Sequence, residues 1–252
     1  MKLLTLARDL RRRRARERQK LFVAEGVRAV EELLTSPLHV RGILVAPQLA
    51  GASRGSILLD DVRRSGAEIA EVDEREFASA AETDSPQGVL AIGEIPEARL
   101  VDLPLPQRAR LVVLDAVQDP GNVGTILRTA AALDADAVVA MPGTVDLWNA
   151  KVVRSAMGAL FHRPAFMSTW AELDTFREAN ALVLWGADAA GTPVETVAPA
   201  ARLGILVGNE GAGLSPEALA RVEQRVSLPI SSTVESLNVA VATGILLYQL
   251  RT

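Results

Sequence analysis

The chain has 252 residues, of which 49% are hydrophobic and 23% charged, with a net charge of −4 and no cysteine. This composition is typical of a folded globular protein, and the length predicts one large or two smaller domains. The longest uncharged apolar stretch, residues 236–250, is too short for a membrane span of about 20 residues. The absence of cysteine excludes disulfides and thiolate metal sites, and two histidines, His39 and His162, give little basis for a histidine metal site or triad. We therefore expect a cytoplasmic protein without membrane or metal partners.

Residues 8–20 form a basic cluster near the start of the chain, where eight basic residues stand against two acidic ones. The segment carries +6, so the remainder of the chain carries −10. A local basic cluster on an acidic protein is typical of a polyanion-binding surface, and a solvated helix face is the alternative explanation. The arginines follow the first apolar residues directly, which argues against a signal peptide.

The first part of the chain alternates short strands and helices. Helices are expected at residues 3–10, 27–35, 56–64 and 74–81, and strands at residues 20–26, 40–46, 68–72 and 88–92. This alternation predicts a small α/β domain over residues 1–95. Three prolines without apolar periodicity follow, and they predict an extended linker over residues 96–108.

The second part of the chain, residues 109–252, alternates more regularly. Strands are expected at residues 111–117, 137–141, 165–167, 182–187, 203–207 and 225–230, and helices at residues 125–133, 150–160, 170–179, 216–222 and 236–250. Buried strands separated by helices predict an α/β domain with a mostly parallel sheet and helices on both faces. Ligands of such sheets bind beyond the carboxyl ends of the strands, so the loops after the strands are the candidate sites.

The loop after the first of these strands carries Asn122, Gly124 and Arg128. Asn122 is suited to cap the following helix, and Gly124 permits a close approach of another backbone. Arg128 lies in an otherwise apolar helix, where a guanidinium is costly unless it meets an anion. A site that binds an anion and a simple capped turn are both compatible with this loop.

The loop over residues 208–217 contains three glycines before Ser215 and Pro216, which are suited to begin a helix. These glycines exceed the needs of a turn, so the backbone is expected to lie against a ligand. Glu210 lies inside the loop and is a candidate partner for Arg128; a solvent-exposed loop acid is the alternative. No G-x-G-x-x-G or Walker pattern is present, which disfavours a nucleotide-binding oxidoreductase.

The last segment, residues 226–250, places Ser236 and Asn238 at the start of an apolar helix. Helix capping alone would explain both residues. Elsewhere, residues 51–55 match G-x-S-x-G, but they do not follow a strand directly and few histidines are present, so a hydrolase is not expected.

Together these three segments resemble the SpoU/TrmH family of RNA 2′-O-ribose methyltransferases, within the SPOUT superfamily. The family's motifs are similar, in order, to residues 122–129 (NVGTILRT), residues 208–215 (GNEGAGLS), and residues 228–230 (LPI) through 235–239 (ESLNV). Residues 151–161 also resemble the helix between the first two motifs. Residues 18–32 resemble the ribosomal-protein-like substrate-binding domain that precedes many members. The resemblance covers essentially the whole chain.

The resemblance implies methyl transfer from S-adenosylmethionine to a ribose 2′-hydroxyl, in a domain that contains a deep trefoil knot. It carries the catalytic roles to Asn122, Arg128, Glu210, Ser236 and Asn238. In the family the arginine is proposed to activate the hydroxyl, with Ser236 and Asn238 orienting it and Glu210 holding the arginine or neighbouring backbone. Because arginine is not deprotonated in proteins, stabilising a developing alkoxide or clamping a phosphate is physically easier for Arg128 than acting as a base.

The resemblance also implies the binding partners. The cofactor is expected against the main chain at Ala187, Gly208, Leu228 and Leu237. RNA contacts are expected at Arg11, Arg12, Arg14, Arg18, Lys151 and Arg154, the last two near the site, with ribosomal RNA favoured over transfer RNA. The family is homodimeric, and the apolar face formed by Val241, Ile245 and Tyr248 is a candidate interface. A catalytically inactive RNA-binding member is the alternative, and the target nucleotide is left open.

Overall fold

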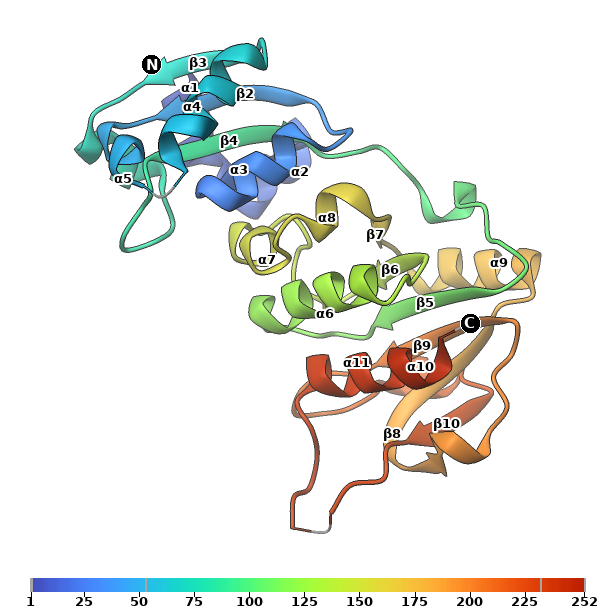
Figure 1. Cartoon of the computed structure of the whole chain (residues 1–252). Helices are drawn as coiled ribbons and strands as arrows, with labels where there is room; N and C mark the ends of the chain where they lie inside the picture. The colour runs from blue at the N-terminus through green and yellow to red at the C-terminus, as the bar shows by residue number, and fades with distance from the viewer. Residues whose placement is uncertain (1, 53, 232, 252) are drawn as a thin grey trace. The chain divides into compact units, whose positions relative to one another are not determined.

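The computed structural model of the protein describes residues 2–52, 54–231 and 233–251. Ser53, in the middle of the G-x-S-x-G match, lies outside the described residues. The chain forms two compact units (Figure 1): Met1–Glu97 with Trp148–His162, and Ala98–Leu147 with Arg163–Thr252. The chain thus crosses between the units three times, whereas the sequence predicts one boundary within residues 96–108.

The first unit contains a four-stranded sheet in the order β1-β4-β2-β3. The strands are β1 (Leu21–Glu25), β2 (Val40–Val45), β3 (Glu68–Glu71) and β4 (Val89–Glu94). Its helices are α1 (Lys2–Leu10), α2 (Arg13–Gln19), α3 (Val27–Leu34), α4 (Gly55–Arg64), α5 (Glu74–Ala80), α7 (Ala150–Ser155) and α8 (Ala159–His162), with the short 3₁₀ helix η1 (Pro47–Gly51). Strand β4 is antiparallel to β1 and β2, and β2 is parallel to β3. All four predicted strands are confirmed.

Aromatic packing explains why residues 148–162 belong to the first unit. The ring of Phe22 on β1 is fully buried, and its centroid lies 4.5 Å from that of Trp148 and 5.5 Å from that of Phe161. The single helix expected over residues 150–160 is interrupted, because Met157 and Gly158 take positive φ angles of 51° and 89°. The break separates α7 from α8.

The second unit contains a six-stranded sheet in the order β10-β8-β9-β5-β6-β7, and every neighbouring pair is parallel. The strands are β5 (Ala109–Leu114), β6 (Ala137–Ala140), β7 (Ala165–Met167), β8 (Val183–Pro193), β9 (Arg202–Val207) and β10 (Gln224–Ser227). Its helices are α6 (Pro120–Ala132), α9 (Trp170–Asn180), α10 (Pro216–Leu219) and α11 (Val239–Leu250), with the 3₁₀ helices η2 (Leu100–Asp102) and η3 (Val194–Thr196). The six strands and the parallel sheet are confirmed.

Both faces of this sheet are covered. Leu111 and Val113 of β5 pack in one cluster with Leu173 and Phe176 of α9. Successive side chains of a strand point to opposite faces of the sheet. Every residue of β5 is buried, so the strand is covered on both faces. Helices α6 and α11 contact each other. The knot implied by the resemblance stays a prediction.

The segment predicted as an extended linker, residues 96–108, packs onto the second unit from Leu100 onward. Leu100, Leu103 and Leu105 join the hydrophobic cluster that contains α9. The guanidinium of Arg202 donates to the carbonyls of Pro106 at 2.9 Å and Leu105 at 3.1 Å. The prolines therefore suppress regular structure without freeing the segment. No helix in the part of the chain that the structure describes is long and apolar enough to cross a membrane.

Candidate active site

The candidate site lies beyond the carboxyl ends of neighbouring strands of the second unit. Strands β8, β9 and β5 are adjacent and parallel, so the loops that follow them meet at one edge of the sheet. The loop after β5 leads into α6, and the loop after β9 is the glycine-rich segment. The segment after β10 leads into α11, which contacts α6.

Three of the predicted catalytic residues form one chain of hydrogen bonds. The Nδ2 of Asn122 donates to Oε1 of Glu210 at 3.0 Å. The Nδ2 of Asn238 donates to Oδ1 of Asn122 at 2.9 Å. The Oδ1 of Asn238 accepts from the N–H groups of Ala240 and Val241, which lie in the first turn of α11. The chain therefore joins one residue from each of the three motif segments and fixes the start of α11.

Glu210 is held by its neighbours as a carboxylate. Besides Asn122, its oxygens accept from the backbone N–H groups of Gln118 at 3.4 Å and Asp119 at 3.3 Å. Burial by itself would raise the pKa of Glu210, but the hydrogen bonds from Asn122 and from backbone N–H groups together outweigh it, so the pKa lies below the ordinary value of 4.5. A depressed pKa means that the ionised group stabilises the fold above the unfolded-state pKa. That stabilisation is lost as the pH falls through the lower folded-state pKa.

Replacing Asn122 by alanine is expected to raise the pKa of Glu210, because the variant removes the side-chain hydrogen bond that lowers it. A ¹³C NMR titration of the Glu210 carboxyl would measure the change, with Asn180→Ala on α9 as the control. Asn180 donates to the carbonyl of Phe176 instead. An unchanged or lower pKa in Asn122→Ala would contradict the network.

The expected contact between Glu210 and Arg128 is not formed. Arg128 is exposed on α6, and its side chain has no hydrogen bond or ion pair with another residue that the structure describes. Glu210 holds the neighbouring backbone, which is the second of the two roles the resemblance allowed. The guanidinium is therefore free of internal partners and faces solvent.

The caps of the two site helices differ from the sequence interpretation. Helix α6 begins at Pro120, and its cap is Asp119, whose side chain accepts from the N–H of Asn122 at 2.8 Å. Helix α11 begins at Val239, and Asn238 is its cap. Asn122 and Ser236 therefore do not cap helices. Because Asp119 takes over the capping role, the side-chain amide of Asn122 remains available for Glu210 and Asn238.

Ser236 lies outside the helix and is exposed. Its side chain has no hydrogen bond to another described residue, so the structure brings it near the start of α11 without joining it to the chain of Asn122, Glu210 and Asn238. The hydroxyl remains able to donate and to accept.

Two residues that the sequence interpretation missed fix the shape of the glycine-rich loop. Asp115, only 2% exposed, directly follows β5, and its carboxylate accepts from the N–H of Ser215 at 2.6 Å and from its hydroxyl at 3.1 Å. Asn209 donates to the carbonyl of Ala116 and accepts from the N–H groups of Gly211 and Ala212. An aspartate directly after an apolar strand was the available signal for Asp115.

The glycines of this loop serve its own folding as well as any ligand. A Cβ on Gly208 would lie 2.2 Å from the carbonyl carbon of Gly213, so only glycine fits there. Gly213 has a φ of 71°, which an L side chain rarely adopts. Gly211 meets only the Asn209 side chain, at 3.7 Å. Two of the three glycines are thus required by the loop itself, so the number of glycines is weaker support for a ligand against this backbone than the sequence analysis assumed.

The four positions expected to hold the cofactor are half-buried: Gly208 and Leu228 directly follow β9 and β10, Ala187 lies within β8, and Leu237 precedes the cap of α11. Residues 187–191, which include Ala187, are not paired with β10, because the register between β8 and β10 shifts there. Apart from strand pairing, the backbone N–H and C=O groups of Gly208, Leu228 and Leu237 make no hydrogen bond to another described residue. Such peptide groups can pair with the polar edges of an adenosine, so the residues present fit S-adenosylmethionine.

The residues predicted to bind RNA all lie in the first unit. Arg11 donates to the carbonyl of Ser79, while Arg12 and Arg18 are paired with Asp9. Arg14 is exposed. Lys151 and Arg154 lie on α7, within the first unit and not within the unit that holds the hydrogen-bonded chain.

One member of the basic cluster has a structural role. Arg16 is 4% exposed and donates to the carbonyls of Leu10 at 2.8 Å and Arg11 at 3.0 Å, where α1 ends. The charge count of residues 8–20 therefore overstates the charge available to a polyanion. Arg16 lies one helical turn after the polar residues that separate α1 from α2. That position was the signal that could have identified its structural role.

Comparison with known proteins assigns both parts of the chain. Residues 109–248 match the model of the SpoU rRNA Methylase family, and residues 5–91 match that of the MRM3-like substrate binding domain. The chain is 34% identical over 243 residues to the 23S rRNA (guanosine(2553)-2′-O)-methyltransferase RlmP of Bacillus subtilis, covering 96% of this chain and 93% of the relative. It is 29% identical over 248 residues to a 23S rRNA (uridine(2479)-2′-O)-methyltransferase of Streptomyces viridochromogenes, covering 94% and 84%.

Solved structures are similar over nearly the whole chain. The SpoU methyltransferase AviRb from Streptomyces viridochromogenes, in complex with AdoMet, has a TM-score of 0.89 at 29% identity and covers 98% of this chain and 96% of its own. An AdoMet-bound rRNA methyltransferase from Sinorhizobium meliloti has a TM-score of 0.86 at 28% identity, covering 99% and 94%. The hydrogen-bonded motif residues and these matches lead to one assignment: the chain belongs to the SpoU rRNA methylase family.

Proposed function

We propose that this protein transfers a methyl group from S-adenosylmethionine to a ribose 2′-hydroxyl of ribosomal RNA. The observation that carries the proposal is the chain of hydrogen bonds through Glu210, Asn122 and Asn238, which unites the three motif segments at one edge of the sheet. The relatives named as 23S rRNA 2′-O-methyltransferases support the substrate class, since the matches extend over both units. Transfer RNA is the alternative substrate class, and the cytoplasm is the proposed location.

The cofactor would be held by main-chain groups at Ala187, Gly208, Leu228 and Leu237. Bound there, S-adenosylmethionine would supply an electrophilic methyl group on a sulfonium sulfur, which leaves as the neutral thioether of S-adenosylhomocysteine. Asp115 and Asn209 hold the loop that carries Gly208, so this part of the binding surface is formed before a ligand arrives.

Arg128 supplies the positive charge of the site. Because a guanidinium does not act as a base in proteins, Arg128 would stabilise the ribose oxygen as its proton passes to solvent water, or clamp the adjacent phosphate. The exposed hydroxyl of Ser236 can accept a hydrogen bond from the ribose hydroxyl or donate one to it. Asn122 and Asn238 hold α6 and the start of α11 together, which keeps the segments that carry Arg128 and Ser236 in a fixed relation.

A direct test uses the purified protein, ribosomal RNA that lacks the modification, and S-adenosylmethionine with a labelled methyl group. Label should enter the RNA, and mapping of 2′-O-methyl positions should give one nucleotide. A substrate with a 2′-deoxyribose at that position should accept no label. If cofactor binds but no ribosomal or transfer RNA is methylated, the chain is an inactive RNA-binding member and the proposal fails.

A homodimer is part of this proposal. Val241, Ile245 and Tyr248 recur along one side of α11 and are 52%, 38% and 55% exposed. Exposed apolar side chains that follow one helix face are typical of an interface between protein chains. A two-fold dimer would bury the same face of both copies.

Replacing Ile245 by arginine is expected to convert the dimer into a monomer, because the variant places a charge in the apolar face. Size-exclusion chromatography with light scattering would measure the mass. Val101→Arg is the control, since Val101 is an exposed apolar residue of the same unit (51%) that lies on η2 instead of α11. A wild-type monomer, or equal masses for both variants, would refute this interface.

A further inference from the structure

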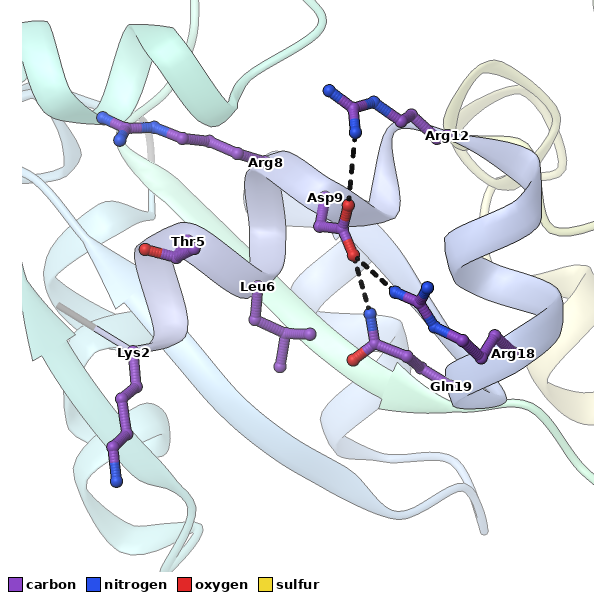
Figure 2. Close-up of a pocket in the computed structure, with 8 residues that line it drawn as sticks. All are labelled: Lys2, Thr5, Leu6, Arg8, Asp9, Arg12, Arg18 and Gln19. Carbon is purple, nitrogen blue, oxygen red and sulfur yellow. Dashed lines mark hydrogen bonds and ion pairs between the residues drawn. The ribbon is translucent and has the colours of Figure 1, made fainter.

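The first unit has a surface pocket whose lining residues overlap only partly with the basic cluster of residues 8–20. It lies along α1 and α2 and has a volume of about 790 Å³. Its lining residues are Lys2, Thr5, Leu6, Arg8, Asp9, Arg12, Arg18 and Gln19 (Figure 2). Four basic side chains and one carboxylate give this lining a charge of +3. The pocket includes Lys2 and Arg8, which the earlier RNA-binding prediction omits, and excludes Arg11 and Arg14.

Asp9 occupies the centre of this pocket and already holds the groups that would bind an anion. Its Oδ2 accepts from Nη2 of Arg18 at 3.2 Å and from Nε2 of Gln19 at 3.0 Å, and its Oδ1 lies 3.7 Å from Nη1 of Arg12. Figure 2 shows these three side chains converging on the carboxylate. The arrangement is that of an anion site in which the protein's own carboxylate provides the two oxygens.

The carboxylate is a weak competitor. The side chains of Arg12 and Arg18 are 81% and 73% exposed, and exposed ion pairs contribute little to stability. A phosphodiester also presents two charged oxygens, and guanidinium groups bind phosphate oxygens through paired N–H donors. An incoming phosphate can therefore replace Asp9 at low cost.

The pocket rests on a fixed frame. The buried guanidinium of Arg16 fixes the corner between α1 and α2 through the carbonyls of Leu10 and Arg11. The Nε of Arg8 donates to the hydroxyl of Ser79 at 2.7 Å, which ties α1 to the end of α5. The two helices thus present their basic side chains from a defined backbone.

We propose that this pocket binds phosphates of the RNA backbone, with Asp9 holding Arg12 and Arg18 in place until an RNA phosphate replaces it. The inference rests on the proposed function, because it assumes that the ligand is RNA. It gives the basic side chains of this region different roles: Lys2, Arg12 and Arg18 bind phosphate, Arg8 and Arg16 support the frame, and Arg13 does neither. Arg13 pairs with Glu17 at 2.7 Å and does not line the pocket.

The test measures the affinity of the full-length protein for a fluorescein-labelled RNA hairpin by anisotropy, over a series of NaCl concentrations. Arg18→Ala should weaken binding several-fold and reduce the slope of log Kd against log salt by about 1, the change expected for one lost phosphate contact. Arg13→Ala, the matched control, should leave both quantities unchanged. Equal effects of the two variants would overturn the proposal.

Asp9→Asn distinguishes two roles of Asp9. If Asp9 only supports the structure, the variant should weaken RNA binding; if Asp9 competes with phosphate for the arginines, the variant should strengthen it. Removal of the negative charge should strengthen RNA binding several-fold, because Arg12 and Arg18 then meet no internal anion. Weaker binding by a variant that melts like the wild type would overturn the role of Asp9. If that variant does not fold, Arg12→Ala compared with Arg13→Ala decides in the same way as Arg18→Ala.

These measurements separate the pocket from the methyltransferase assignment. S-adenosylmethionine affinity, measured by calorimetry, should be the same in all four variants and the wild type. Failure to methylate any RNA would refute the proposed function and leave the RNA-binding comparison intact. Methylation of ribosomal RNA together with equal RNA affinities of Arg18→Ala and Arg13→Ala would refute the pocket alone.

Discussion

Replacing Arg128 by alanine is expected to abolish methyl transfer while S-adenosylmethionine still binds with nearly wild-type affinity. Arg128 is exposed on α6 and has no hydrogen bond or ion pair to another described residue, so the substitution breaks no internal contact. What it removes is the charge available to a developing alkoxide or to the adjacent phosphate. Loss of one group that stabilises an oxyanion typically costs a factor of about 10² to 10³ in kcat. Single-turnover transfer of a labelled methyl group and calorimetric titration of the cofactor measure the two quantities.

Two further variants sharpen the result. Arg128→Lys keeps a positive charge but loses the planar fork of donors, and it should also lose most activity if the guanidinium geometry matters. Arg163→Ala removes another arginine of the same unit, one paired with Asp134 at 2.6 Å, and should leave transfer nearly unchanged. Near-wild-type turnover by Arg128→Ala would refute the role assigned to this residue.

Replacing Asp115 by alanine is expected to weaken S-adenosylmethionine binding by about tenfold or more, since each unsatisfied buried donor costs about 1–3 kcal/mol and 1.4 kcal/mol is tenfold. The carboxylate holds both the N–H and the hydroxyl of Ser215, and Ser215 in turn caps α10. Without it, the loop that carries Gly208 loses its fixed shape and must be ordered by the ligand. Calorimetry measures the affinity, and thermal unfolding measures the accompanying loss of stability.

The control for this prediction lies at the opposite end of the same strand. Asp136 accepts from the backbone N–H of Arg110 at 2.8 Å, at the start of β5 and away from the site. Asp136→Ala should lower the melting temperature and leave cofactor affinity unchanged. If Asp115→Ala lowers stability by a similar amount and also leaves affinity unchanged, its role is structural only. Asp115→Asn keeps an acceptor oxygen for Ser215 and should recover part of the affinity.

The order of secondary structure follows from local pattern. Apart from one arginine each, Arg110 and Arg202, strands β5 and β9 consist of apolar residues, which is the pattern of parallel strands covered on both faces. The positions of the candidate loops follow in turn, because ligands of such sheets bind beyond the strand ends. The residue types at 122, 210 and 238 were also compatible with helix caps and a loop acid, so it was the resemblance of the three segments to one family that selected them together as a candidate site.

Helix boundaries were the least accurate part of the prediction, and the reason is specific. Asp119 precedes Pro120 and competes with Asn122 for the role of cap, while Asn238 competes with Ser236. All four residues are of types that can cap a helix, so composition does not decide between them. The choice depends on tertiary partners: Asp119 caps α6 while the amide of Asn122 bonds to Glu210, and Asn238 both caps α11 and bonds to Asn122.

The sequence by itself determined the two α/β parts, the parallel sheet and the three segments that carry the candidate site, since hydrophobic period and turn residues act over short distances. The tertiary structure decided the partners: Asn238 meets Asn122 across 116 positions, and Ser215 meets Asp115 across 100. It also decided that residues 148–162 join the first unit through Phe22 and that Asp9 lies among the arginines of a pocket. Such pairings depend on strand order and on burial, and hydrogen bonds between side chains far apart in the chain leave no periodic trace in the sequence.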